Sequence, residues 1–358
     1  MRATLSGLLL AAAASIAVAH GHEGKWLYGY QGWFRKPASG VNNHWSPNGG
    51  TPGPDNVEFE FVPDVSQYPA NCLFTSTLTA PNGQPVQLYD NTCQGVVDLH
   101  FKWMQQYGID GIIVQRFLSH LSDASFITVS PQPSRSRRRQ IRPRLHRRIR
   151  RLRRKLRHRQ RRPTVAINVT DGANIAAQLK NAGAYVGYGV PANFGTDVRA
   201  NTGFAAAYKA ANLISPWTVG SFSNGGYLKG YHTTTQIPDS QTLQSLGIDH
   251  APLIWPGTSA YHLNGVNTPA NFDYFARFNG SFYSMQADAI ASLAVKPLFA
   301  FNAMFDEINE GTQSLPCLKN NQLPTNEKFV GYDNTFTDTA FYLELGGQKA
   351  AAFAAAVK

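Results

Sequence analysis

The sequence predicts an α/β protein built on a (β/α)8 TIM barrel, and three observations lead to this fold class. Apolar runs of strand length alternate with helix-like patterns, which is typical of βα units in a parallel arrangement. The 358 residues are enough for a large core, and hydrophobic residues make up 43% of them. Carboxylates also follow directly after a buried apolar run near residue 300. Barrels of this type carry their chemistry at that point.

Residues 1–19 have the pattern of a secretory signal peptide. Arg2 precedes the apolar run 8–18, which closes in Ala17-Val18-Ala19. A basic start, a short apolar core and an Ala-x-Ala end are typical of a leader that is removed. The run is too short to cross a membrane. We therefore expect a secreted, extracellular monomer with no membrane partner, formed by one barrel domain over residues 20–358.

The three cysteines fit an oxidising compartment. Cys72 and Cys93 would close a short loop and are the favoured pair, although the sequence leaves other pairings with Cys317 open. Asn168 and Asn279 each begin an Asn-x-Ser/Thr sequon, which predicts a glycoprotein where the site is exposed.

The net charge of +11 comes from one segment. Residues 135–162 hold 17 of the 33 Lys and Arg and no acid, which leaves 16 basic against 22 acidic residues elsewhere. Like charges at this density predict disorder for a basic insert over 128–163. Two interpretations stay open: a genuine arm that binds polyanions, or a mistranslated stretch. The abrupt change in composition favours the second, so nucleic acid is not an expected partner.

The remaining chain predicts elements in alternating order. A long loop region over 35–93, rich in Pro, Gly and Asn, is expected to be functional. Strands are expected over 25–34, 109–117, 164–169, 185–191, 213–220, 251–257, 281–286 and from 296, and helices over 95–108, 174–182, 203–211 and 342–357.

The run that begins at Lys296 ends in three acids, Asp306, Glu307 and Glu310, and then Gly311. A glycosidase needs two carboxyl groups in one pocket, one to exchange a proton and one to attack or stabilise. Glu307 and Glu310 are the best such pair in the chain, with Asp306 beside them. The competing interpretation is an acidic loop that caps a helix.

The same segment carries a resemblance. Phe305-Asp306-Glu307-Ile308-Asn309-Glu310-Gly311-Thr312-Gln313 resembles the Glu-x-x-Glu-Gly-Thr strand end of the endo-α-mannosidase-like glycoside hydrolases, families 71 and 99 taken broadly. The segments 30–34, 100–117, 214–220, 253–257 and 282–286 are similar to further strand ends of these families. In the place of one strand–helix unit, where the families have a strand ending in an aspartate, this chain has the arginine-rich segment.

The resemblance implies that Glu310 is the general acid/base and Glu307 the partner carboxylate, which would help the sugar's own 2-hydroxyl to attack. It implies no metal and no cofactor. Ile308-Asn309 stand where the mannosidase phrase has Trp-His, which leaves the substrate open among α-mannan, α-1,3-glucan and arabinose- or xylose-bearing polymers. A carbohydrate-binding barrel without turnover is the alternative, and a polyanion-binding protein is a third.

Aromatic and polar residues at strand ends are candidates for sugar binding, because ring faces stack on pyranose C–H groups while polar tips meet hydroxyls. For any single ring the competing interpretation is packing in the barrel mouth. Arg116 has the alternative of a structural ion pair, and His262 that of an exposed loop residue. The predicted substrate-binding residues are Tyr30, Gln31, Trp33, His44, Trp45, Gln115, Arg116, Trp217, Trp255, Tyr261, His262, Gln286 and Asp306.

Overall fold

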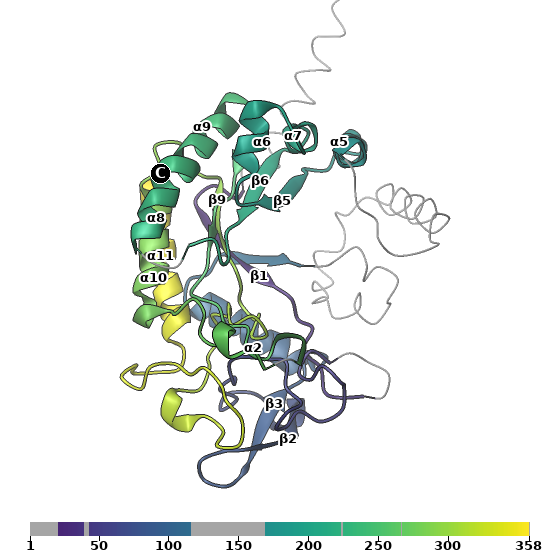
Figure 1. Cartoon of the computed structure of the whole chain (residues 1–358), viewed down its shortest axis with the longest axis vertical. Coiled ribbons are helices and arrows are strands. Elements are labelled where there is room, and N and C mark those ends of the chain that lie inside the picture. Colours follow the sequence, from purple (N-terminus) through teal and green to yellow (C-terminus); the bar gives the residue numbers. More distant parts are fainter. Residues whose placement is uncertain (1–20, 39–42, 116–168, 223–224, 266, 358) are drawn as a thin grey trace, which may run out of the picture.

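The computed structural model describes residues 21–38, 43–115, 169–222, 225–265 and 267–357 (Figure 1). The strands are β1 (Lys25–Tyr30), β2 (Leu73–Thr79), β3 (Pro85–Tyr89), β4 (Gly111–Val114), β5 (Gly187–Pro191), β6 (Leu213–Trp217), β7 (Asp249–His250), β8 (Leu253–Ile254) and β9 (Phe299–Asn302). The helices are α2 (Gln94–Gln106), α5 (Val169–Asn181), α6 (Phe194–Ala200), α7 (Ala205–Lys209), α8 (Gly225–Tyr231), α9 (Ile237–Ser245), α10 (Ser281–Ala291) and α11 (Phe341–Val357).

Strand β1 is buried from Trp26 to Tyr30 and lies inside a parallel sheet of order β4-β1-β9-β8. Its neighbours on the two sides are β4 and β9. Among the parallel strands, β4 is the next one after β1 in the chain and β9 is the last. A strand buried on both faces carries a continuous apolar run instead of an alternating one, as the sequence Trp-Leu-Tyr-Gly-Tyr does here. The α/β class with parallel strands is therefore confirmed.

A second parallel sheet has the order β5-β6-β7. The short segment 249–254 connects it to the first, because β7 pairs with β6 while β8 pairs with β9. The amide of Ala251 donates to Ile214 at 2.9 Å, and the carbonyl of His250 accepts from Leu298 at 2.9 Å. All these strands point the same way, so their ends share one side of the molecule, called here the carboxyl edge. The described strands do not close into a barrel: β4 and β5 are the outer strands, and the chain between them includes residues 116–168.

Helices α8, α10 and α11 stand together along one side of the sheet (Figure 1). Trp26 of β1 packs against Tyr283 of α10 and Phe353 of α11, with ring centroids 6.4 and 5.7 Å apart. Each fully buried aromatic of this kind contributes about 2–3 kcal/mol. The longest helix is thus fixed to the strand that precedes it by more than three hundred residues. Among the described residues, no helix is both long and apolar enough to pass through a bilayer.

Several expected elements are confirmed, and three differ. Residues 281–286, predicted as a strand, begin helix α10; their aromatic run suits a strand, but Gly280 with φ 84° turns the chain into a helix there. The expected loop 35–93 contains the hairpin β2–β3, whose alternating burial fits one packed face. Helices α6, α8 and α9 were not predicted. The leader 1–19, Arg116, the basic insert 128–163 and most of the strand expected over 164–169 lie outside the described residues.

The predicted pairing of Cys72 with Cys93 is confirmed. Their Cα atoms are 5.5 Å apart and their sequence separation is 21 residues. The bridge joins the start of the β2–β3 hairpin to the residue before α2. Cys317 is free and buried.

Replacing both bridge residues, Cys72→Ser with Cys93→Ser, is expected to lower the free energy of unfolding by about 3 kcal/mol, because an open loop of this length gains conformational entropy when the chain unfolds. Urea denaturation checks this. The wild type under reducing conditions should match the double variant, and reductant should leave the double variant unchanged. An equal midpoint for oxidised wild type and double variant contradicts the expectation.

Candidate active site

The loop that follows β9 folds back on itself and carries both candidate acids. The amide of Met304 donates to Thr312 at 2.9 Å, and the amide of Thr312 donates to Glu307 at 3.1 Å. Gly311 has φ +64°, and a Cβ at this position would lie 3.0 Å from the backbone nitrogen of Ser259. A side chain there would thus meet both backbone strain and a close neighbour. We call residues 304–314 the acid loop.

Two neighbouring residues fix the backbone at Glu310. The amide of Ser259 donates to the Glu310 carbonyl at 3.0 Å, and the hydroxyl of Thr258 donates to the same oxygen. The Glu310 side chain is partly exposed while its main chain is tied down. The backbone at Glu310 is therefore held by hydrogen bonds from the segment that follows β8.

Arg277 holds the other side of the acid loop. One of its guanidinium nitrogens donates to the carbonyls of Gly311 and Gln313, at 2.8 Å each. The group is 8% exposed and lies 4.5 Å from the ring centroid of Phe61 and 4.6 Å from that of Tyr342. Carbonyl oxygens and ring faces thus stabilise this buried cation.

A buried acid, Glu60, contacts the acid loop and is 0% exposed. Its amide donates to the carbonyl of Ile308 at 2.8 Å. Its carboxylate accepts hydrogen bonds from the Ser259 hydroxyl and, at 2.6 Å, from the His262 amide. The His262 ring is 1% exposed, 3.6 Å from Glu60 and 3.4 Å from Glu327. His262 is therefore neither an exposed loop residue nor open to substrate. Its link to the acid loop runs through Glu60, which hydrogen-bonds to Ile308.

Glu307 and Glu310 interact electrostatically. Glu307 is 5% exposed, and burial raises its pKa well above the ordinary value, with a further rise from the charge of Glu310. Hydrogen bonds from the Gln31 side chain and, at 3.1 Å, the Asn309 amide oppose this rise in part. Burial also raises the pKa of Glu310. Both acids of the pair therefore have raised pKa values, and the charge of Glu310 contributes to the rise at Glu307.

Several predicted residues meet next to this pair. The side-chain nitrogen of Gln31 lies 3.5 Å from the side-chain oxygen of Gln115. Because the Gln31 side chain also hydrogen-bonds to Glu307, the ends of β1 and β4 lie next to this acid. Trp33 and His44 stack in parallel, with ring centroids 4.6 Å apart. The Asn309 side chain donates to the His44 carbonyl at 3.1 Å. These residues therefore border the acid loop at the carboxyl edge.

Asp306 was predicted to bind substrate, but its position is structural. It is 0% exposed, and its two carboxylate oxygens accept hydrogen bonds from the amides of Gln31 and Gly32 at 2.8 and 2.6 Å. Tyr30 is also buried, and its hydroxyl lies 3.0 Å from Nδ1 of His100. Burial lowers the pKa of His100 to about 3, so this ring is neutral. Both predicted residues support the acid loop from within the core.

Trp45, Trp255 and Gln286 are core residues, although Trp255 directly follows β8. Trp45 and Trp255 are both 0% exposed, which leaves no ring face for a sugar. Gln286 lies on α10, not on a strand, and its amide donates to the carbonyls of Trp255 and Phe282. Large aromatic side chains bury most of their area in cores, and in this chain a strand-end position did not prevent it.

Two predicted aromatic residues stay accessible. Trp217, at the end of β6, is 38% exposed. Tyr261 is partly exposed, and the Lys328 ammonium lies 5.1 Å from its ring centroid. Arg116 lies outside the described residues, so its predicted role stays a prediction.

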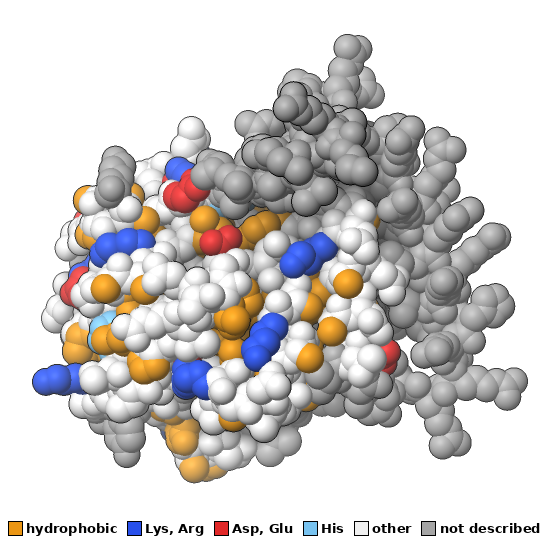
Figure 2. Space-filling model, turned by 90° about the horizontal axis from the view of Figure 1, so that it is seen from above, with side chains coloured by type: hydrophobic (Ala, Val, Ile, Leu, Met, Phe, Trp, Pro, Cys, Tyr) orange, Lys and Arg blue, Asp and Glu red, His pale blue; other side chains and the backbone are white. Residues whose placement is uncertain are grey.

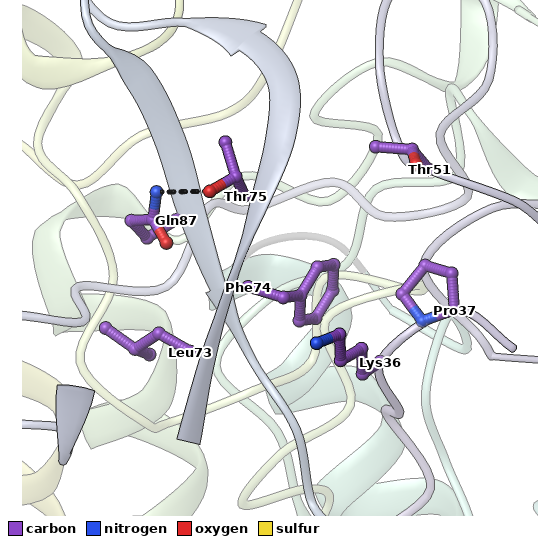
Figure 3. A pocket seen from close by; sticks show the side chains of 7 residues that line it. All are labelled: Lys36, Pro37, Thr51, Leu73, Phe74, Thr75 and Gln87. Atoms are coloured by element: carbon purple, nitrogen blue, oxygen red, sulfur yellow. Dashed lines mark hydrogen bonds between the residues drawn. The ribbon is translucent and has the colours of Figure 1, made fainter. Parts of the chain in front are cut away.

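A separate hollow of about 330 Å³ lies along the β2–β3 hairpin (Figure 3). It contains no carboxylate and no histidine, so it offers no acid–base pair. Its lining residues are Lys36, Pro37, Thr51, Leu73, Phe74, Thr75 and Gln87.

The described residues include no metal centre, and the face in Figure 2 shows no continuous basic patch. No group of three His, Cys, Asp or Glu side chains is placed there to hold a metal ion. On the face shown in Figure 2, the coloured Lys and Arg side chains lie apart from one another among polar and hydrophobic ones. Nucleic-acid binding normally needs such charges in a continuous patch.

Sequence reasoning missed Glu60, Ser259 and Arg277. Glu60 had a weak signal, since it stands between Phe59 and Phe61. An acid between apolar residues is a candidate for a buried, hydrogen-bonded charge. Ser259 and Arg277 had no such signal, because their roles depend on carbonyl groups far away in the chain.

No protein-family model and no curated protein matches the sequence. Solved structures do match in fold. The GH99 endo-α-mannosidase from Bacteroides thetaiotaomicron aligns with a TM-score of 0.58 at 13% identity, over 93% of this chain and 98% of that one. Its complex with bis-tris propane aligns with a TM-score of 0.55 at 13% identity, over 92% and 97%. The chain thus shares the fold of this glycoside hydrolase along nearly its whole length.

The Glu310→Gln variant is expected to lower the pKa of Glu307, because it removes the neighbouring negative charge that raises it. NMR titration of 13C-labelled glutamate side chains measures this shift. Glu344→Gln, an exposed position on α11, is the matched control and should leave Glu307 unchanged. An unaltered Glu307 titration in Glu310→Gln contradicts the coupling.

Proposed function

We propose that this chain is a glycoside hydrolase that cleaves α-linked glycans, with Glu307 and Glu310 as its catalytic acids. The observation that carries the proposal is the coupled pair of carboxyl groups in one rigid loop at the carboxyl edge. The shared fold with an endo-α-mannosidase supports it. Candidate substrates are α-mannan, α-1,3-glucan and polymers bearing arabinose or xylose.

In the proposed reaction Glu310 is the general acid/base. It is the more exposed of the two carboxyl groups, so it is placed to reach the bridging oxygen of a bound glycan. Its proton passes to that oxygen as the bond to the anomeric carbon breaks. The deeper Glu307 acts as a carboxylate and takes the proton of the attacking hydroxyl, which belongs to the sugar itself or to water. At the end of the step Glu310 is a carboxylate and Glu307 is protonated.

Catalysis in this assignment needs the proton on Glu310 and the charge on Glu307. Burial and the charge of Glu310 raise the pKa of Glu307. Hydrogen bonds from the Gln31 side chain and from the Asn309 amide act in the opposite direction and stabilise the Glu307 carboxylate.

The proposal includes a (β/α)8 barrel in which the arginine-rich segment takes the place of one strand–helix unit. In such a barrel the first strand lies between the second and the last, and β1 lies between β4 and β9. Counting along the sheet order, two strands are needed between β4 and β5. The predicted strand over 164–169 would supply one of them, although its last residue, Val169, begins α5 in the structure. The other is the unit in whose place the chain has the arginine-rich segment.

Secretion after removal of residues 1–19 is part of the proposal, as are glycosylation at exposed sequons and a monomeric state. The bridge between Cys72 and Cys93 supports an oxidising compartment.

Replacing either acid, as Glu307→Gln or Glu310→Gln, is expected to lower kcat/KM on the α-linked polymer that wild type cleaves by about 10²–10⁴-fold, because proton transfer is lost. Release of reducing sugar measures this. Glu344→Gln should retain full activity. If the wild type binds these polymers and releases no sugar from any of them, the chain is a binding protein without turnover.

The proposed assignment also fixes the shape of the pH–rate profile. Activity should fall on the acid side as Glu307 takes up a proton, and on the alkaline side as Glu310 loses one. Burial raises both pKa values, so the acid limb should lie above the ordinary glutamate value of 4.5.

The measurement is kcat/KM against pH, for wild type and for Glu310→Gln. An aryl glycoside with an acidic leaving group needs no general acid, so on this substrate Glu310→Gln should keep activity and lose the alkaline limb. A variant that keeps that limb shows that another group is the acid.

A further inference from the structure

Tyr274 is the most exposed large hydrophobic side chain in the described residues, at 60%. Single exposed aromatic residues are common on protein surfaces and need no function. What distinguishes Tyr274 is its support, since the backbone on both sides of it is hydrogen-bonded to the segment that also holds Glu310.

The amide of Asp273 donates to the Ser259 hydroxyl at 3.0 Å. Phe275 and Thr258 exchange two backbone hydrogen bonds, both 3.0 Å long. The Tyr274 ring meets the Phe275 ring edge-on at 4.4 Å. Phe275 is itself buried against Trp255, 5.5 Å away. Tyr274 is therefore an exposed ring on a fixed backbone, and ordering it on a ligand costs little entropy.

The same two residues connect Tyr274 to the proposed acid. The Ser259 amide and the Thr258 hydroxyl both donate to the Glu310 carbonyl. One hydrogen-bonded step thus separates Glu310 from residues 258–259, and one more separates these from the backbone that flanks Tyr274.

We infer that Tyr274 is a sugar-binding residue, a stacking surface for a pyranose ring of the glycan some distance from the bond that is cleaved. An aromatic face binds the apolar C–H face of a pyranose. Tyr274 lies in the connection that leads from the carboxyl end of β8 to α10, on the carboxyl edge where the acid loop also lies. This inference rests on the proposed function for its substrate class, and it adds the position of an outer subsite.

The position predicts a dependence on chain length. A short oligosaccharide that fills only the space at the acids does not reach Tyr274, whereas a longer one does. Losing the ring is therefore expected to weaken binding of long oligosaccharides by about 2–10-fold, which corresponds to the 0.5–1.5 kcal/mol typical of aromatic contacts. Binding of the shortest oligosaccharides should stay unchanged.

The experiment compares Tyr274→Ala, Tyr274→Phe and Phe204→Ala. Tyr274→Phe keeps the ring and removes the hydroxyl. Phe204 is a matched control because it is 41% exposed and precedes α7, which leads to the opposite end of β6. Calorimetry with α-1,6-manno- and α-1,3-gluco-oligosaccharides of increasing length gives Kd in the Glu310→Gln background, and hydrolysis is measured with Glu310 intact.

The expected result is weaker binding of long oligosaccharides by Tyr274→Ala alone, with Tyr274→Phe and Phe204→Ala equal to the parent. If Tyr274→Ala equals the parent at every length while the wild type hydrolyses the glycans, this inference fails and the proposed function stands. If nothing is hydrolysed but Tyr274→Ala still weakens binding, the inference stands and the proposed function fails. Absence of any binding overturns both.

Discussion

The carboxylate of Asp306 joins the ends of two neighbouring strands, and the geometry of the acid loop depends on this contact. It accepts hydrogen bonds from the backbone amides of Gln31 and Gly32, which follow β1, while Asp306 itself follows β9. Hydrogen bonds to a buried charged acceptor contribute about 1.5–3 kcal/mol each. The amide of Phe305 adds a backbone bond to Gly29 at 2.8 Å. The loop is thus fixed to β1 before it reaches Glu307.

This contact has an electrostatic consequence for the next residue. The negative charge of Asp306 raises the pKa of Glu307, although burial and the charge of Glu310 contribute more. The groups that oppose the rise are an amide side chain and a backbone N–H, which are weaker than a cation would be. Arg277, a buried guanidinium that contacts the acid loop, donates to the carbonyl oxygens of this loop. Glu307 is therefore kept prone to protonation, as a residue that exchanges protons should be.

The parallel strands and the disulfide could be predicted from sequence because their signals are local. Buried parallel strands read as continuous apolar runs, and two cysteines separated by a short loop favour each other. The run 281–286 shows the limit. Its aromatic residues suit a strand, but Gly280 and the contacts of Tyr283 with Trp26 place it in a helix. Short apolar runs do not distinguish the two.

The site was only partly predictable for a related reason. Sequence identifies which side chains could bind a sugar, but their burial depends on neighbours that are distant in the chain. Trp45 packs at 5.0 Å from Tyr89 and 5.2 Å from Phe59, and neither contact follows from a local pattern. Glu60 and Ser259 act on the backbone of the acid loop, so no motif of their own marks them.

Burial separates the functions of three acids that stand within five residues of one another. Asp306 is 0% exposed with both oxygens occupied by amides, and it can only hold structure. Glu307 is 5% exposed, and burial and the charge of Glu310 raise its pKa. Glu310 is partly exposed, and its backbone is held by hydrogen bonds to its carbonyl group. The sequence shows three equivalent carboxylates here, whereas the turn of the acid loop gives Asp306 a structural position and gives Glu307 and Glu310 raised pKa values.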